Sequence, residues 1–287
     1  MPIKPSTRPE SYSELITRSL RLYKTGLPSV FLFALLASMV VFIPRLISVA
    51  VGQNVFLTTT KVNQVALLYL AMYLSLLWFT AAILWGLNCI ERNNHKNFIV
   101  DFEMAGKRIL YVFGAALCFL FIITLIGLFA FSLNKIFWFW KLFSYDKYLA
   151  SFLLFIVLFG QFAFTVWMVT LFYFYFPLIV IEHDGIFLAF KQSAQLVKNQ
   201  VGKTLALQLT PWIVYIIALV LVRIIFKVNL NVYFMPKDPV STLYPTLLHI
   251  FILAFFIPWE CSMILVQLRD LELRKITVLP QKNDLSE

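Results

Sequence analysis

The chain is poor in charged residues. Asp, Glu, Lys and Arg make up 13% of its 287 residues, whereas soluble domains carry about 25%. Hydrophobic residues make up 61%, and the mean hydropathy is +0.85. A soluble fold cannot hide that much apolar surface from water. The composition therefore excludes an ordinary soluble domain and indicates an integral membrane protein.

Residue types that build most active sites and metal sites are also scarce. The chain has three histidines and three cysteines, which are His95, His183, His249, Cys89, Cys118 and Cys261. The cysteines lie in or beside apolar runs without a partner at short spacing, so we interpret them as small buried hydrophobes. No phosphate-binding glycine loop, nucleophile elbow or paired CxxC motif occurs. We expect no cofactor, no metal site and no catalytic residue.

The net charge is +10, yet no run of five or more Lys and Arg occurs. The basic residues sit in short segments between apolar runs. Nucleic acid is therefore excluded as an expected partner, and orientation in a bilayer is the simpler explanation of the charge.

Six apolar runs are long enough for spanning helices, each of which needs about 20 residues. They are Leu27–Val51, Val65–Ile90, Ile109–Phe131, Tyr148–Ile181, Thr204–Phe226 and Leu243–Val266. The fourth run would extend about 51 Å as one helix, against a hydrocarbon core of about 30 Å. It is too short for two spans and a turn, so we expect it to tilt, protrude or break, with Pro177 as the break. The predicted fold is all-α, a polytopic membrane protein with six transmembrane helices.

The distribution of Lys and Arg predicts the orientation of these spans. Sixteen fall in the N-terminal tail, the second-to-third and fourth-to-fifth connections and the C-terminal tail, and eight fall on the opposite side. Because positive residues stay inside, we expect an inner (plasma) membrane protein with both termini in the cytoplasm. No early apolar stretch resembles a cleavable secretory signal.

An internal repeat is the simplest organisation of the segments between spans. Residues 11–24 form an amphipathic pattern that begins with a capping box, Ser11 and Glu14. A shift of 174 residues places this pattern on the segment before the fifth span, with Asp184 as its predicted N-cap. Half of that shift places a weaker copy before the third span. We predict units 11–90, 97–181 and 185–266, each an interfacial amphipathic helix and two spans, and a cytoplasmic tail 267–287; chance spacing is the alternative.

Two segments resemble a known family. They are Ile179–Leu205, with the sequence IVIEHDGIFLAFKQSAQLVKNQVGKTL, and Ile264–Lys275, with the sequence ILVQLRDLELRK. The first is similar to the acidic turn and amphipathic helix of the YciC-like family and of the membrane domain beside some glycerophosphodiester phosphodiesterases. The second is similar to that family's closing motif. The resemblance implies a multi-spanning inner-membrane protein without an established activity.

Polar side chains within the apolar runs are the candidate functional residues, because their burial in a bilayer is costly. The strongest pair is Glu260 and His249, which share a helix face unless Pro258 disturbs it. A proton or cation path through both is one reading. In the second interpretation, Glu260 forms an ion pair with a basic residue and His249 forms an interhelical hydrogen bond.

Further candidates are Arg45, Arg223, Gln161 and Gln208. Each arginine lies toward the outer end of a span, where it either binds lipid phosphate or extends to the headgroups. The glutamines either join helices by hydrogen bonds or line a polar cavity.

Two functions suit this sequence. The first is an accessory, scaffold or envelope-homeostasis protein that acts through contacts with membrane lipids or a membrane-protein partner. The second is a transporter or flippase for a lipid or small amphiphile, with its site between units. A membrane enzyme ranks third, because convergent acid, base and metal groups are missing.

Overall fold

The computed structural model describes residues 8–51, 62–92, 98–143, 147–227 and 243–278, which are almost entirely helical and contain no strand. The elements are α1 (Tyr12–Val51), α3 (Val62–Glu91), α4 (Phe98–Phe143), α5 (Lys147–Leu171), α6 (Tyr175–Pro177), the π-helix η1 (Leu178–Glu182), α7 (Ile186–Val197), α8 (Val201–Phe226) and α9 (Leu243–Val278). Within these ranges six helical segments are long and apolar enough to cross a bilayer. The predicted all-α polytopic fold is confirmed.

Two of the predicted interfacial segments are continuous with the spans that follow them. Helix α1 begins at Tyr12 and α4 at Phe98, so neither segment is a separate helix. The capping box is present, since the Ser11 amide donates to Glu14 Oε2 at 2.7 Å and the Glu14 amide donates to Ser11 Oγ at 3.4 Å. Passage from interface to hydrocarbon changes the surroundings of the side chains but not the backbone hydrogen bonds of a helix. The change in hydropathy therefore does not mark a helix end.

Helix α7 is a separate amphipathic helix, but it is not the interfacial helix that the sequence predicts, because its apolar face packs against protein rather than lipid. The buried side chains of that face are Ala189, Phe190, Ser193, Leu196 and Val197. They pack against protein, because α7 contacts α4, α5, α6, η1 and α9. The amphipathic pattern identified the helix correctly and its environment wrongly.

The fourth apolar run breaks, although not at the predicted residue. Helix α5 ends at Leu171, and residues 172–174 form the turn that leads into α6. The break therefore lies before Pro177, which is the last residue of α6. Ser193 on α7 stabilises this break: its hydroxyl donates to the Leu171 carbonyl oxygen at 2.7 Å and accepts from the Phe174 amide at 3.1 Å. A partner distant in the sequence therefore supplies the hydrogen bonds that a break in hydrocarbon needs.

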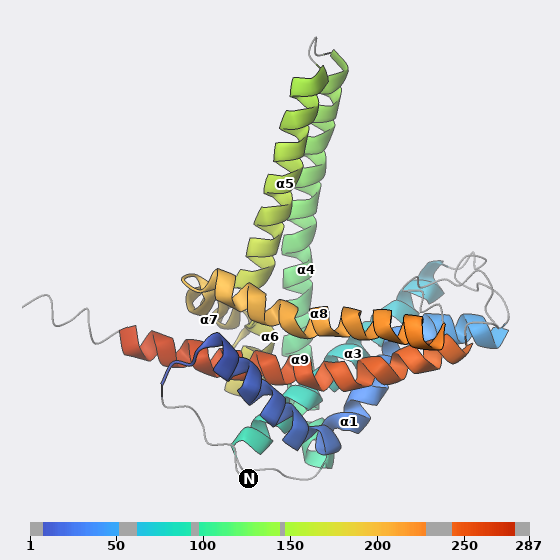
Figure 1. Cartoon of the computed structure of the whole chain (residues 1–287), viewed down its shortest axis with the longest axis vertical. Coiled ribbons are helices and arrows are strands. Elements are labelled where there is room, and N and C mark those ends of the chain that lie inside the picture. Colours follow the sequence, from blue (N-terminus) through green and yellow to red (C-terminus); the bar gives the residue numbers. More distant parts are fainter. Residues whose placement is uncertain (1–7, 52–61, 93–97, 144–146, 228–242, 279–287) are drawn as a thin grey trace, which may run out of the picture.

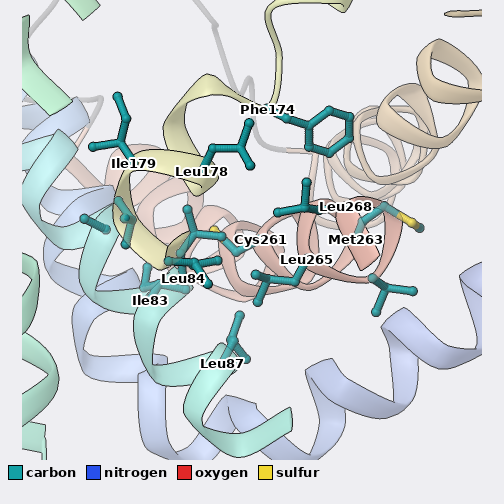
Figure 2. Packing of buried hydrophobic residues seen from close by; sticks show 14 of the residues in the cluster. Ile83, Leu84, Leu87, Phe174, Leu178, Ile179, Cys261, Met263, Leu265 and Leu268 are labelled. Carbon is teal, nitrogen blue, oxygen red and sulfur yellow. The ribbon is translucent and has the colours of Figure 1, made fainter. Parts of the chain in front are cut away.

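Helices α1 and α9 form the centre of the molecule and pack extensively against each other, with α3 alongside. Figure 2 shows part of the buried core, where Leu84 and Leu87 of α3 and Leu178 of η1 lie close to Leu265 and Leu268 of α9. The most hydropathic windows of α1 and α9 are 50% and 56% buried within the protein, against 17% in α4 and none in α5. The molecule thus has a packed centre and a periphery whose apolar side chains are not buried within the protein.

Helices α4 and α5 form that periphery. They run antiparallel as a long hairpin that projects away from the other helices and stands crosswise to α8 and α9 (Figure 1). Its side chains are largely exposed apolar residues, among them Phe121, Phe129, Phe155 and Phe159. The six candidate spans therefore do not form one parallel bundle.

Candidate functional site

A cavity of about 400 Å³ lies among α1, α3, α8 and α9. Its lining residues are Val41, Phe42, Arg45, Leu76, Thr80, Trp212, Tyr215, His249, Leu253, Ile257, Glu260, Cys261 and Ile264. A mainly apolar cavity of this size with a few polar groups is typical of a small-molecule site. It unites three of the six candidate residues, namely Arg45, His249 and Glu260.

The periodicity of each helix explains how these side chains meet. Residues three or four positions apart share one face of an α-helix. Helix α9 follows this rule with His249, Leu253, Ile257 and Glu260, so Pro258 does not separate the two titratable side chains into different environments. The prediction that Glu260 and His249 lie on one helix face is confirmed.

One end of the cavity carries Arg45 and His249. Both are almost fully buried, with 2% and 3% of their surfaces exposed. The Phe42 ring lies 4.7 Å from the His249 ring, and Tyr215 Oη forms a hydrogen bond with His249 Nε2. His249 thus makes the interhelical hydrogen bond that one reading predicted, here between α9 and α8.

Glu260 lies toward the other end. Its Oε1 atom accepts a hydrogen bond of 3.1 Å from Trp212 Nε1 on α8. The prediction that Glu260 pairs with a basic residue is not met, since none of the ion pairs among the described residues includes it. The carboxyl group of Glu260 therefore has a neutral indole as its hydrogen-bond donor in place of a cation.

The other candidates lie outside the cavity. Arg223 is exposed near the end of α8. Gln161 joins the hairpin, with Nε2 donating to the Ala130 carbonyl oxygen at 3.4 Å. Gln208 is buried on α8, and its Nε2 has no hydrogen-bond partner in the described part of the chain. The hydrogen-bonding interpretation of Gln161 is confirmed, and none of the three lines the site.

A second hollow of about 480 Å³ lies between α4 and α5, lined by residues that include Asn134, Lys135 and Trp138. The Lys135 ammonium lies 4.9 Å from the centre of the Phe131 ring. This hollow gathers none of the predicted candidates. The cavity near α9 is therefore the stronger candidate site.

Two ionic clusters lie at the opposite end of the central helices from Arg45. The Asp270 cluster comprises Glu10, Arg18, Glu91, Lys203, Asp270 and Arg274. The Asp270 carboxylate accepts from the Glu10 amide at 2.7 Å, from Lys203 Nζ at 3.0 Å and from Arg274 Nε at 2.8 Å. Arg18 bridges Glu10 and Glu91 at 3.1 and 2.6 Å. The cluster joins the N-terminal segment, α1, α3, α8 and α9.

The Glu182 cluster comprises Asn88, Arg92, Glu182, Arg269 and Glu272. Arg269 Nη1 donates to Glu182 Oε1 and to Glu272 Oε2, at 2.8 Å in each case. The two clusters hold together segments that the sequence assigned to one side of the membrane.

The turn Glu182, His183, Asp184 does not cap α7. The N-cap is Gly185, without a side-chain cap hydrogen bond, so the prediction for Asp184 is wrong. His183 takes a left-handed conformation, with φ of 63°, which turns the chain ahead of α7. Burial lowers the pKa of His183, with Arg108 adding to this effect and Glu182 opposing it, and burial and Glu182 raise the pKa of Asp184. No group of three metal-binding side chains occurs among the described residues.

Sequence reasoning missed Trp212 and Tyr215, which supply the hydrogen-bond partners of Glu260 and His249. Aromatic residues are frequent in membrane helices as lipid-facing or interfacial side chains, so neither residue stood out. Their spacing of three on α8, just after Pro211, is the one local signal that both face the same way.

No family model matches this chain, and no curated protein and no solved structure matches it either. The resemblance to the YciC-like family stays a prediction.

Proposed function

We propose that this multi-spanning membrane protein binds an amphiphile in the cavity among α1, α3, α8 and α9. It acts as an accessory, scaffold or envelope-homeostasis protein of the inner (plasma) membrane. The observation that carries the proposal is one apolar cavity that contains Arg45, His249 and Glu260. The proposal includes no catalytic step.

The composition of the lining supports an amphiphile rather than a polar solute. Aliphatic side chains from α1, α3 and α9 line the cavity beside its few polar groups, and Leu253 and Ile257 lie between His249 and Glu260 on α9. An apolar wall gives no hydrogen bonds to replace those a polar solute would lose on leaving water. A molecule with a polar end and an apolar chain satisfies both parts of the lining.

A cavity-filling variant tests the proposal. The protein is purified from its native membrane in a mild detergent, and its bound lipids are identified by mass spectrometry. Leu253→Trp places a large ring in the cavity and is expected to remove a retained amphiphile. Leu247→Trp is the matched control, because Leu247 lies on the same helix and is 49% exposed.

Loss of a specific lipid from the Leu253 variant alone supports the proposal. Equal lipid content in the wild type and both variants would show that only surface lipid is bound, which overturns it.

Transport of a lipid or small amphiphile is the second candidate. The observation that favours it is the presence of polar groups at both ends of one cavity. Reconstitution into liposomes with a fluorescent lipid distinguishes the two functions. A transporter moves the lipid and loses rate in Glu260→Gln, whereas an accessory protein gives no flux above protein-free liposomes in either form.

A further inference from the structure

We infer that the cavity selects amphiphiles with an oxyanionic headgroup, a phosphate or a carboxylate, and holds that headgroup at the end formed by Arg45 and His249. This inference rests on the proposed function, because it names the class of ligand for the same cavity.

The first argument is the position of Arg45. Its side chain lines the cavity, and 2% of the residue surface is exposed. A guanidinium offers five N–H donors, accepts no hydrogen bond and keeps its positive charge. Oxyanions match the planar fork of arginine, so an oxyanion inside the cavity can accept hydrogen bonds from this side chain.

The second argument is the tautomer of His249. Tyr215 Oη bonds to His249 Nε2, and a phenol is the stronger donor of this pair while a neutral imidazole nitrogen is the stronger acceptor. With Nε2 accepting, the proton of the neutral ring lies on Nδ1. That buried Nδ1 has no hydrogen-bond partner in the described part of the chain. A second donor thus lies at the same end as Arg45, and an oxyanion accepts from both.

The third argument is the polarity of the far end. Glu260 follows His249 by eleven residues on α9, which is about 16 Å at 1.5 Å per residue. Its carboxyl group already accepts from Trp212 Nε1, and no cation pairs with it among the described residues, so this end offers an anion less than the Arg45 end does. Leu253 and Ile257 lie between the two ends on the same helix face. The chain of the ligand therefore lies along these residues, with its terminus toward Glu260.

Binding of a matched series of amphiphiles tests the inference. The probes share a tetradecanoyl chain: lysophosphatidic acid, the free fatty acid, zwitterionic lysophosphatidylcholine and uncharged monoacylglycerol. Affinities for the delipidated full-length protein in an uncharged detergent are measured by titration calorimetry. We expect the two anionic probes to bind at least about tenfold more tightly than the uncharged one, the scale of one charge-assisted hydrogen bond.

Variants locate the effect. Arg45→Gln is expected to lose the preference for anionic probes and to keep the affinity for monoacylglycerol, while Arg45→Lys keeps part of the preference. Arg223→Gln is the matched control, because Arg223 is an exposed arginine outside the cavity, and it should bind as the wild type does. Thermal unfolding of each variant shows whether it is folded.

Inorganic phosphate distinguishes a lipid headgroup from a free oxyanion. It should compete with lysophosphatidic acid only weakly, because it lacks the chain. Equal affinity for all four probes, an unchanged preference in folded Arg45→Gln, or phosphate binding as tight as that of lysophosphatidic acid would overturn the inference alone. Absence of binding by every probe would overturn the proposed function as well.

Discussion

Asp270 has the most hydrogen bonds of the carboxylates in the ionic clusters described here. It is 2% exposed and accepts from two cationic side chains and one backbone amide. The same side chain lies in the segment Ile264–Lys275 of α9. That segment therefore has a structural role, which is to join the end of α9 to the N-terminal segment and to α8.

Removal of this charge should destabilise the protein. In Asp270→Asn, Lys203 and Arg274 lose the negative charge of Asp270. Breaking a buried ion pair costs about 3–5 kcal/mol, and we expect about 3 kcal/mol because both cations keep some contact with solvent. Unfolding of the purified protein in detergent by heat or by increasing denaturant measures the loss.

The exposed pair Glu103 and Lys107, whose side chains are 61% and 60% exposed, supplies the control. Glu103→Gln should leave stability unchanged within error, because exposed ion pairs contribute little. Similar effects from both substitutions would mean that burial of the Asp270 cluster does not matter to stability.

Ser193 is an uncharged side chain whose contribution to stability also depends on burial. It is fully buried, and its single hydroxyl satisfies two backbone groups at the break between α5 and α6. Ser193→Ala leaves both groups unsatisfied, at a cost of about 1–3 kcal/mol. We expect faster hydrogen exchange at the Phe174 amide, measured by mass spectrometry of peptides that cover the break.

Ser132→Ala is the matched substitution, since Ser132 is exposed and its hydroxyl donates to the Leu128 carbonyl oxygen of its own helix. Exchange at the break should not respond to it. An unchanged Phe174 amide in Ser193→Ala would contradict the assigned role of the hydroxyl.

At the scale of elements, the spans end in a recurring way. An acidic side chain lies near the end of α3, of η1 and of α9, at Glu91, Glu182 and Asp270, and each pairs with a basic residue. These positions are 91 and 88 residues apart, close to the 87-residue half-shift of the predicted repeat. The three-unit organisation remains a prediction, and this pattern is what such a repeat would produce.

The α4–α5 hairpin is held differently from the central helices. Because lipid tails are as apolar as the side chains, packing and interhelical hydrogen bonds hold such a pair together. Gln161 supplies one of these bonds. In Gln161→Leu we expect a loss of less than about 1 kcal/mol, the usual scale for such bonds in a membrane, and no change in ligand binding at the cavity.

Steric trapping or denaturant unfolding measures that stability, and the calorimetric titration measures binding. A marked loss of amphiphile binding in folded Gln161→Leu would show that the hairpin contributes to the site.

At the scale of the whole molecule, the two ends of α8 test the predicted orientation. Lys198 and Lys227 flank this helix and are both exposed. In a background with the native cysteines replaced by alanine, we expect Lys227→Cys to react in intact cells with a maleimide that cannot cross the membrane. Lys198→Cys should react only after permeabilisation, because the basic segments lie inside. Labelling of Lys198→Cys in intact cells would show that the orientation is opposite to the predicted one.

The sequence by itself determined the class of protein, the six apolar segments and the helix face shared by His249 and Glu260. These are local properties, because a chain in lipid must satisfy its backbone within each helix and side chains three or four residues apart share a face. Only the tertiary structure decided that Arg45 joins that face while Arg223 does not, that Trp212 and Tyr215 supply the partners, and that the hairpin stands crosswise to α8 and α9. Helix association depends on shape and on contacts between residues far apart in the chain, and hydropathy does not record them.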